Sequence, residues 1–150
     1  MKTIYPVHWP QLLYEIMRKF KIILVFIFLM VAVYFILRPS TKKLIADLDS
    51  KNHTTTKVKA AYKLGERKEK TAVVPLLTHI LDPSTSANLS FKGMTVCYAK
   101  LIALNKISGI QPPNELNIEV DTMAVKFYLN WAIKEGYLKS EKEIDLTYFH

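Results

Sequence analysis

Residues 58–82 read VKAAYKLGERKEKTAVVPLLTHILD, and this stretch decides the fold. Apolar residues recur at helical spacing on both sides of a charged turn, ERKEK. The set before the turn is Val58, Ala61, Tyr62 and Leu64. The set after it is broader and consists of Val73, Val74, Leu76, Leu77, Ile80 and Leu81. Each set can cover the other, so the stretch predicts two short helices that pack through their apolar faces.

Residues that start and stop helices mark the ends of this pair. The threonine run 54–56 is predicted to cap the first helix, and Gly65 is predicted to end it in a left-handed conformation. Thr71 is the predicted cap of the second helix, and Pro75 lies in its first turn or just past it, where a missing N–H costs little. The second helix is then expected to continue to Asp82.

The rest of the chain beyond Pro39 also has helical character. It has no sustained strand alternation and no Asn-Gly or Asp-Gly dipeptide. A short helix is expected over residues 44–48, with Ser40 or Thr41 as its cap, and a last helix over residues 121–135, capped by Asp121 and stopped by Gly136. The predicted fold class is therefore all-α.

The pattern resembles a HEAT-type helical repeat of the short, phycobilisome-lyase-like class. The resemblance is carried by Val58-Lys59, Ala60-Ala61, Leu64-Gly65, Ala72-Val73, Leu76 and Leu81-Asp82. LIADLDSKN, from Leu44, resembles the end of a preceding repeat, and VCYAKLIALNKISG, from Val96, resembles the first helix of the next. The resemblance covers residues 44–109 and implies a short α-solenoid, which the helix over residues 121–135 would close as a capping unit.

An apolar block precedes this region. Residues 22–37 read IILVFIFLMVAVYFIL and carry no charge. A membrane-crossing helix needs about 17–25 residues, and Lys21 and Arg38 can extend the run because their stems reach toward lipid headgroups. Trp9 favours the membrane interface. These features predict a single-pass membrane protein that binds the bilayer through this block.

The expected division of the chain follows from that anchor. Residues 1–20 form an N-terminal tail, residues 21–38 the transmembrane helix, and residues 39–150 the HEAT-like domain. The tail has two interpretations: an early start of the membrane helix, or a separate helix that lies on the membrane or packs on a partner. Basic residues flank both ends of the apolar block, so the side of the membrane that holds the domain stays open.

The basic residues are spread along the chain. The formal net charge is +8, and beyond residue 38 sixteen Lys/Arg against twelve Asp/Glu leave +4. Nucleic acid is not an expected partner, because aromatic residues are not interleaved with the lysines. Lys59, Lys63 and Arg67 are spaced to share one helix face, which is interpreted either as a solvated outer face or as the candidate surface for an acidic protein partner or anionic lipid.

The sequence shows no catalytic or metal-binding constellation. Its four histidines are not at metal-ligand spacing, and His79 with Asp82 is more typical of a surface contact than of a ligand pair. Cys97 falls on an apolar helix and is expected to be a buried small side chain. With four glycines in the chain there is no glycine-rich phosphate loop, and no cofactor is expected.

These observations favour binding over catalysis. The predicted function is a membrane-anchored scaffold or accessory subunit that offers a helical surface to a protein partner, as part of a larger membrane assembly. Two alternatives stay open: a HEAT-like enzyme, chromophore-lyase-like or metal-dependent, and a peripheral module that binds anionic lipid. A polar pocket lined by His79 would favour the enzyme, and an exposed apolar strip would favour the scaffold.

Overall fold

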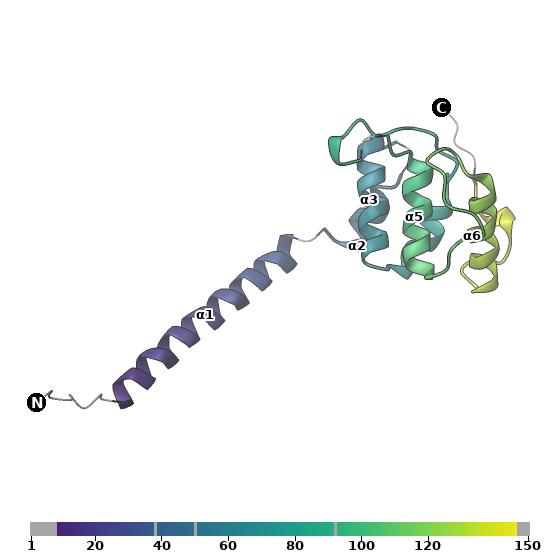
Figure 1. Ribbon diagram of the computed structural model, residues 1–150. Helices are drawn as coiled ribbons and strands as arrows, with labels where there is room; N and C mark the ends of the chain where they lie inside the picture. Colours follow the sequence, from purple (N-terminus) through teal and green to yellow (C-terminus); the bar gives the residue numbers. More distant parts are fainter. Residues whose placement is uncertain (1–8, 38, 50, 92, 147–150) are drawn as a thin grey trace, which may run out of the picture. The chain divides into compact units, whose positions relative to one another are not determined.

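The computed structural model describes residues 9–37, 39–49, 51–91 and 93–146 (Figure 1). The helices are α1 (Trp9–Leu37), α2 (Thr41–Ala46), α3 (Thr54–Glu66), α4 (Val73–Leu77), α5 (Val96–Ser108) and α6 (Thr122–Lys134), with 3-10 turns η1 (Lys70–Ala72), η2 (Leu89–Phe91) and η3 (Glu141–Glu143). Among the described residues the only β pairing is one isolated bridge, Thr85 with Thr95. The all-α prediction is confirmed. The chain divides into two units, Met1–Pro39 and Ser40–His150.

The first unit consists of one long helix. α1 is continuous across the predicted boundary between residues 1–20 and 21–38, and its described large apolar side chains, from Leu13 to Val33, are exposed. Of the predicted membrane flanks, Trp9 is the first residue of α1, Lys21 is exposed, and Arg38 lies outside the described residues.

The predicted single-pass membrane location is contradicted. No helix in the part of the chain that the structure describes is long and apolar enough to cross a membrane. Charged residues lie within the first half of α1, where Arg18, Lys19 and Lys21 are exposed, and a charged side chain inside the hydrocarbon core of a bilayer is costly.

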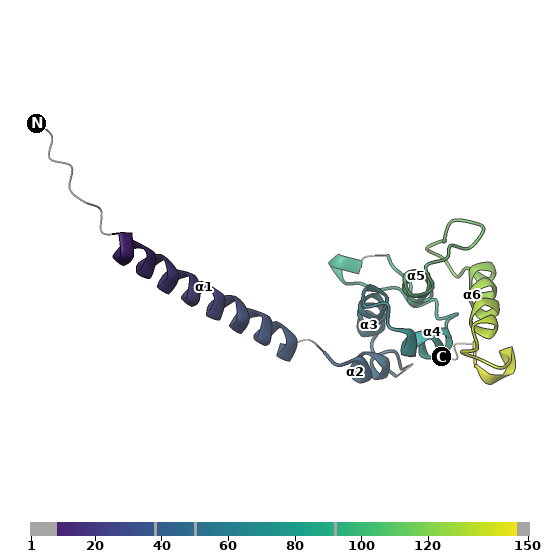
Figure 2. The ribbon, with the colours of Figure 1, turned by 90° about the horizontal axis from the view of Figure 1, so that it is seen from below.

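The second unit is built around α3 and α5, which lie side by side (Figures 1 and 2). The two helices run in the same direction. Asp82 marks their beginnings, because its side chain meets Lys57 on α3 and its carbonyl accepts from the N–H of Cys97 on α5. Farther along, Gly65 of α3 faces Ala103 of α5. α2 packs against α3, while α4 and α6 pack against α5 and each other.

Gly65 has a different role from the predicted one. It lies inside α3, and a Cβ at this position would come within 2.7 Å of the Cα of Ala103. The missing side chain therefore allows the backbones of α3 and α5 to approach closely. The left-handed residue that follows the helix is Lys68, whose φ is 50°.

The second helix of the predicted pair is shorter than expected. α4 ends at Leu77, Thr78 is extended, and His79 has a φ of 49°. The ammonium group of Lys100 donates to the carbonyls of Thr78 (2.6 Å) and His79 (3.3 Å), and the N–H of His79 donates to the carbonyl of Asp145 (2.7 Å). The predicted helix therefore does not continue beyond Leu77, and hydrogen bonds with Lys100 and Asp145 hold Thr78 and His79 instead.

The helix caps follow the prediction in part. Ser40 caps α2 and Asp121 caps α6, each accepting a backbone N–H with its side chain. α3 begins differently: His53 is its cap, and the imidazole Nδ1 accepts from the N–H of Thr55. Beyond α6, Gly136 has a φ of 79°, as expected for a residue that turns the chain out of a helix.

Candidate binding surfaces

The three predicted basic residues lie at the outer side of α3. Lys59 is exposed and Lys63 half-buried on the helix, and Arg67, also half-buried, is its C-cap. Glu66 stands among them and forms an ion pair with Lys106. We call Lys59, Lys63 and Arg67 the basic row.

Tyr62 borders the basic row instead of facing inward. Its side chain is 38% exposed, and the ammonium of Lys106 lies 4.6 Å from the centre of its ring. This cation–π contact leaves one face of Tyr62 covered by a charge rather than by the core.

Lys57, from the same basic stretch, is buried. Its ammonium lies 2.6 Å from Oδ2 of Asp82, and both side chains are almost fully buried. Burial alone would raise the pKa of the Asp82 carboxyl, but hydrogen bonds from Lys57 and Ser84 hold that pKa below its usual value. This pair fixes α3 to the segment that leads into α5.

Lys100 is a second buried lysine in this region. Burial lowers the pKa of Lys100 to about 8, because the charged form is poorly solvated, although nearby Asp82 acts in the opposite direction. A lysine with such a pKa is a candidate catalytic group. Here its ammonium donates to two backbone carbonyls at the end of α4, and it lines none of the hollows described below. Its geometry is that of a structural residue.

The other candidate reactive residues do not form a site. His79 does not pair with Asp82: its Nδ1 lies 3.8 Å from the carboxylate of Asp145. Cys97 is fully buried, as predicted, and burial raises the pKa of its thiol to about 11, so the thiol is protonated at neutral pH. Among the described residues, no group of three or more His, Cys, Asp or Glu side chains could hold a metal ion.

A hollow of about 480 Å³ does include His79. Its other residues are Ile45, Ala46, Leu48, Asp49, Lys51, Val74, Pro75 and Thr78. Five of these nine side chains are apolar. The hollow is therefore lined by His79 but is only partly the polar pocket that would favour an enzyme. A single imidazole beside one carboxylate and one lysine does not form a metal site or an activated nucleophile.

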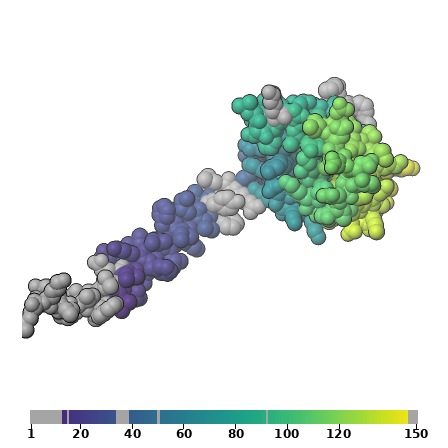
Figure 3. All heavy atoms as spheres, in the orientation of Figure 1, coloured from purple at the N-terminus to yellow at the C-terminus, as the bar shows by residue number. Residues whose placement is uncertain are grey.

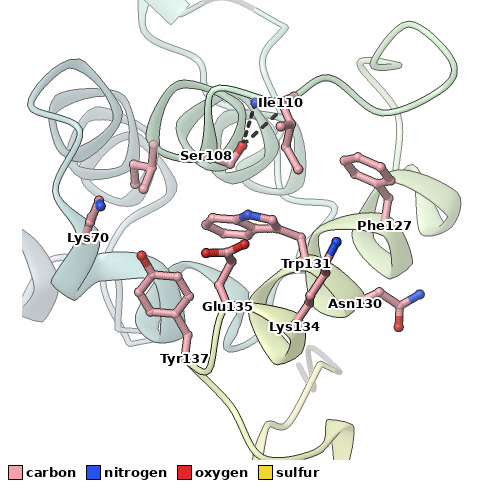
Figure 4. A pocket seen from close by; sticks show the side chains of 10 residues that line it. Lys70, Ser108, Ile110, Phe127, Asn130, Trp131, Lys134, Glu135 and Tyr137 are labelled. Carbon is pink, nitrogen blue, oxygen red and sulfur yellow. Dashed lines mark hydrogen bonds between the residues drawn. The ribbon is translucent and has the colours of Figure 1, made fainter.

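A larger hollow of about 510 Å³ lies between α6, the end of α5 and the turn that holds Lys70 (Figure 4). We call it the α6 hollow. It is lined by Lys70, Ile107, Ser108, Ile110, Phe127, Asn130, Trp131, Lys134, Glu135 and Tyr137. The rings of Trp131 and Tyr137 form one wall, with centroids 5.4 Å apart and planes at 40°.

The fold holds these aromatic side chains in place. Tyr128 is fully buried behind them and meets the rings of Phe127 and Trp131 edge to face, with centroids 5.2 Å and 6.5 Å away. Gly136, with its positive φ, turns the chain back so that Tyr137 reaches Trp131, and the N–H of Tyr137 donates to a carbonyl of α6. The wall is therefore supported by the buried ring of Tyr128 and by the turn at the end of α6.

The α6 hollow continues into a smaller one of about 230 Å³. The two share Phe127 and Asn130, and the smaller also includes Pro112, Pro113, Asn114, Asp121, Met123, Ala124 and Lys126. The side chains at 123, 127 and 131 form an apolar row four residues apart, and those at 126, 130 and 134 a polar row beside it. We call these two rows the α6 outer face; α6 is among the segments that form the visible surface of the second unit (Figure 3).

This surface was not predicted as a binding site. Phe127 and Trp131 are half-buried and pack against the core, and Tyr128 and Ala132 beside them are fully buried. The sequence did contain an indication: α6 is apolar along more than one face, because both the 123–127–131 and the 124–128–132 rows are apolar. The 124–128–132 row is buried, whereas in the 123–127–131 row Phe127 and Trp131 are half-buried against the core and Met123 is exposed. A comparison with known protein families, with curated proteins and with solved structures found no match to this chain.

Proposed function

We propose that residues 40–146 form a protein-binding module, a helical scaffold or adaptor, whose contact surface is the α6 outer face. The observation that carries the proposal is the α6 hollow, with its wall of Trp131 and Tyr137. Tyrosine and tryptophan are enriched at the energetic centres of protein interfaces. Met123, at the far end of the face, is 72% exposed, and an adaptable apolar side chain of this kind suits a contact surface.

The arrangement of α3 and α5 supports a repeat-like scaffold. The two helices run in the same direction and approach closely at Gly65, as equivalent helices of two neighbouring HEAT-like repeats would do. α6 would then be the closing unit of the stack. A closing helix that only sealed the core would carry a polar outer face, whereas α6 leaves Met123 exposed and Phe127 and Trp131 half-buried beside it.

The basic row on α3 has a secondary part in this proposal. Lys59 and Lys63 form no ion pair with any residue that the structure describes. Exposed charges of this kind attract an acidic partner over distance and raise the association rate more than the final affinity. Anionic lipid is the competing occupant of the same row.

Capture experiments with paired variants test the proposal. Met123→Glu/Asn130→Glu places two carboxylates on the α6 outer face at exposed positions without removing a core contact. Leu89→Glu/Ser90→Glu is the matched control, since it also changes one exposed apolar and one exposed polar residue. Proteins captured by the wild-type chain and the control, but lost from the α6 variant, are the expected result. If the α6 variant retains every captured protein, the proposed surface is wrong.

A further inference from the structure

We infer that the α6 hollow binds an extended acidic peptide segment, with one bulky apolar side chain of the peptide against Trp131 and Tyr137 and carboxylates of the peptide beside Lys70 and Lys134. This inference rests on the proposed protein-binding function and names the class of partner. The hollow has about 510 Å³, within the roughly 300–1,000 Å³ of pockets that bury a ligand.

The shape of the surface fits an extended chain. The α6 hollow and the smaller hollow follow α6 together from Met123 to Lys134. At about 1.5 Å per residue this part of the helix measures about 16 Å, which is the length of about five residues of extended peptide. One bulky side chain can occupy the α6 hollow while the neighbouring residues continue over Phe127 toward Met123.

The charges at the rim favour a negative partner. Lys70 and Lys134 line the α6 hollow, Lys126 lines the smaller one, and no ion pair joins any of the three to a described residue. The opposing carboxylates are Asp121 and Glu135. Asp121 is engaged as the cap of α6, where it accepts from the N–H of Ala124 at 2.9 Å.

Glu135 decides where the acidic groups of the peptide would lie. Figure 4 shows its carboxylate beside the ring of Trp131, with Lys70 and Lys134 on different sides of the hollow. A peptide carboxylate at the centre would be repelled by Glu135, while the aromatic wall there favours an apolar side chain. The geometry therefore assigns the apolar anchor to the middle and the acidic residues to the ends.

The backbone N–H and carbonyl of Ile110, beside the hollow, are already bonded. The carbonyl of Ile110 accepts from the hydroxyl of Tyr128 at 3.1 Å, and the N–H of Ile110 donates to the hydroxyl of Ser108 at 3.2 Å, the latter drawn in Figure 4. The peptide therefore cannot pair with the backbone of Ile110 as an added β-strand, and its recognition depends on side chains. Such recognition requires the aromatic wall and the rim lysines together.

Selection from a phage-displayed library of random peptides tests the inference. The full chain is the target, and Met123→Glu/Asn130→Glu is used for counter-selection. We expect the enriched peptides to combine Asp or Glu with a bulky apolar residue. One enriched peptide, labelled with a fluorophore, then serves as the probe for affinity measurements. Lys70→Glu/Lys134→Glu should weaken its binding on the order of tenfold at low salt, while the matched Lys139→Glu/Lys142→Glu should change it less than about twofold.

Each other outcome overturns the inference. Enrichment of basic or uncharged peptides, absence of enrichment, or equal effects of the two lysine variants would each show that the hollow does not select acidic segments. The proposed function is tested separately by the capture experiment. If the α6 variant loses captured proteins while no acidic peptide is enriched, the binding surface stands and the class of partner is wrong. Self-association of the chain through this face, measured by sedimentation, would likewise replace the peptide with a second copy.

Discussion

α3 and α6 are both helices of thirteen residues, but they use their apolar residues differently. α3 has core neighbours along its length, and its outer side carries Lys59, Lys63, Glu66 and Arg67. α6 buries Ala124, Val125, Tyr128, Leu129 and Ala132 and still places Met123, Phe127 and Trp131 on its outer face. In α3 the one exposed large apolar side chain is Tyr62, which Lys106 covers, whereas α6 leaves Met123 72% exposed and Phe127 and Trp131 half-buried at the edge of the core. An apolar surplus of this kind identifies a contact surface better than a row of charges does.

The largest expected effect contrasts two lysines of α3. Lys57→Ala should lower the free energy of unfolding by about 3–5 kcal/mol, because it leaves the buried carboxylate of Asp82 without its cation. Lys59→Ala, at an exposed position two residues away, should change it by less than about 0.5 kcal/mol. Urea unfolding of both variants measures the difference. Similar losses in the two would mean that Lys57 is not a core residue.

The inner side of α3 and the outer side of α6 should also differ. Leu64 is fully buried, so Leu64→Ala should cost about 2–5 kcal/mol through lost burial and a residual cavity. Met123→Ala should cost less than about 0.5 kcal/mol, because the side chain is 72% exposed, yet it should weaken partner capture. Thermal unfolding together with the capture assay tests this pair. A strong destabilisation by Met123→Ala would place that side chain in the core and remove it from the binding surface.

Gly65 tests the contact between α3 and α5. Gly65→Ala should destabilise the protein by about 1–3 kcal/mol, because the added Cβ would meet the Cα of Ala103 at 2.7 Å and the two helices would have to separate. Lys68→Gly should stabilise it by about 0.5–1 kcal/mol, since glycine adopts the left-handed φ of 50° without strain. A left-handed helix end at Gly65 would also make Gly65→Ala destabilising, but it would give Lys68→Gly no stabilising effect. Chemical denaturation of the two variants distinguishes these arrangements.

Local sequence patterns predict part of the fold, and Gly65 shows where they fail. The all-α class, the cap at Asp121 and the turn at Gly136 follow from local patterns, and the structure contains them. Gly65 was misassigned because a glycine near a helix end and a glycine at a helix crossing look alike in one sequence. Only the position of Ala103, distant in sequence, separates the two roles.

The same limit applies to the site. The early end of α4 depends on Lys100 and on the carbonyl of Asp145, which are distant from it in sequence. The α6 hollow likewise needs Lys70 from the turn after α3 to meet Trp131 and Tyr137. Periodicity predicted an apolar α6, but not which of its apolar rows would find the core.

A pH titration tests the buried lysine beside α4. The pKa of Lys100 is about 8 in the folded chain, below its ordinary value of 10.5. Between these two values the unfolded chain keeps a proton that the folded chain has lost, so folding stability should rise with pH across this window. The slope contributed by one such group is at most about 1.4 kcal/mol per pH unit.

Lys100→Met is the reference for this titration, because methionine does not titrate. The difference in unfolding free energy between wild type and Lys100→Met should grow in favour of wild type from pH 8 to pH 10. A constant difference would show that Lys100 keeps an ordinary pKa despite its burial.

The smallest expected effect on stability is that of the basic row. Lys59→Glu/Lys63→Glu/Arg67→Glu should change the free energy of unfolding by no more than about 1 kcal/mol per residue, because charges in contact with solvent contribute little. If these residues attract an acidic partner, the variant should associate more slowly than wild type at low salt. This difference in association rate should disappear as added salt shortens the electrostatic screening length below ~10 Å. Association rates over a salt series, for a partner found by capture and for anionic liposomes, measure this effect. Unchanged rates for both at every salt concentration would show that the row is a solvated face, and that binding depends on the α6 outer face alone.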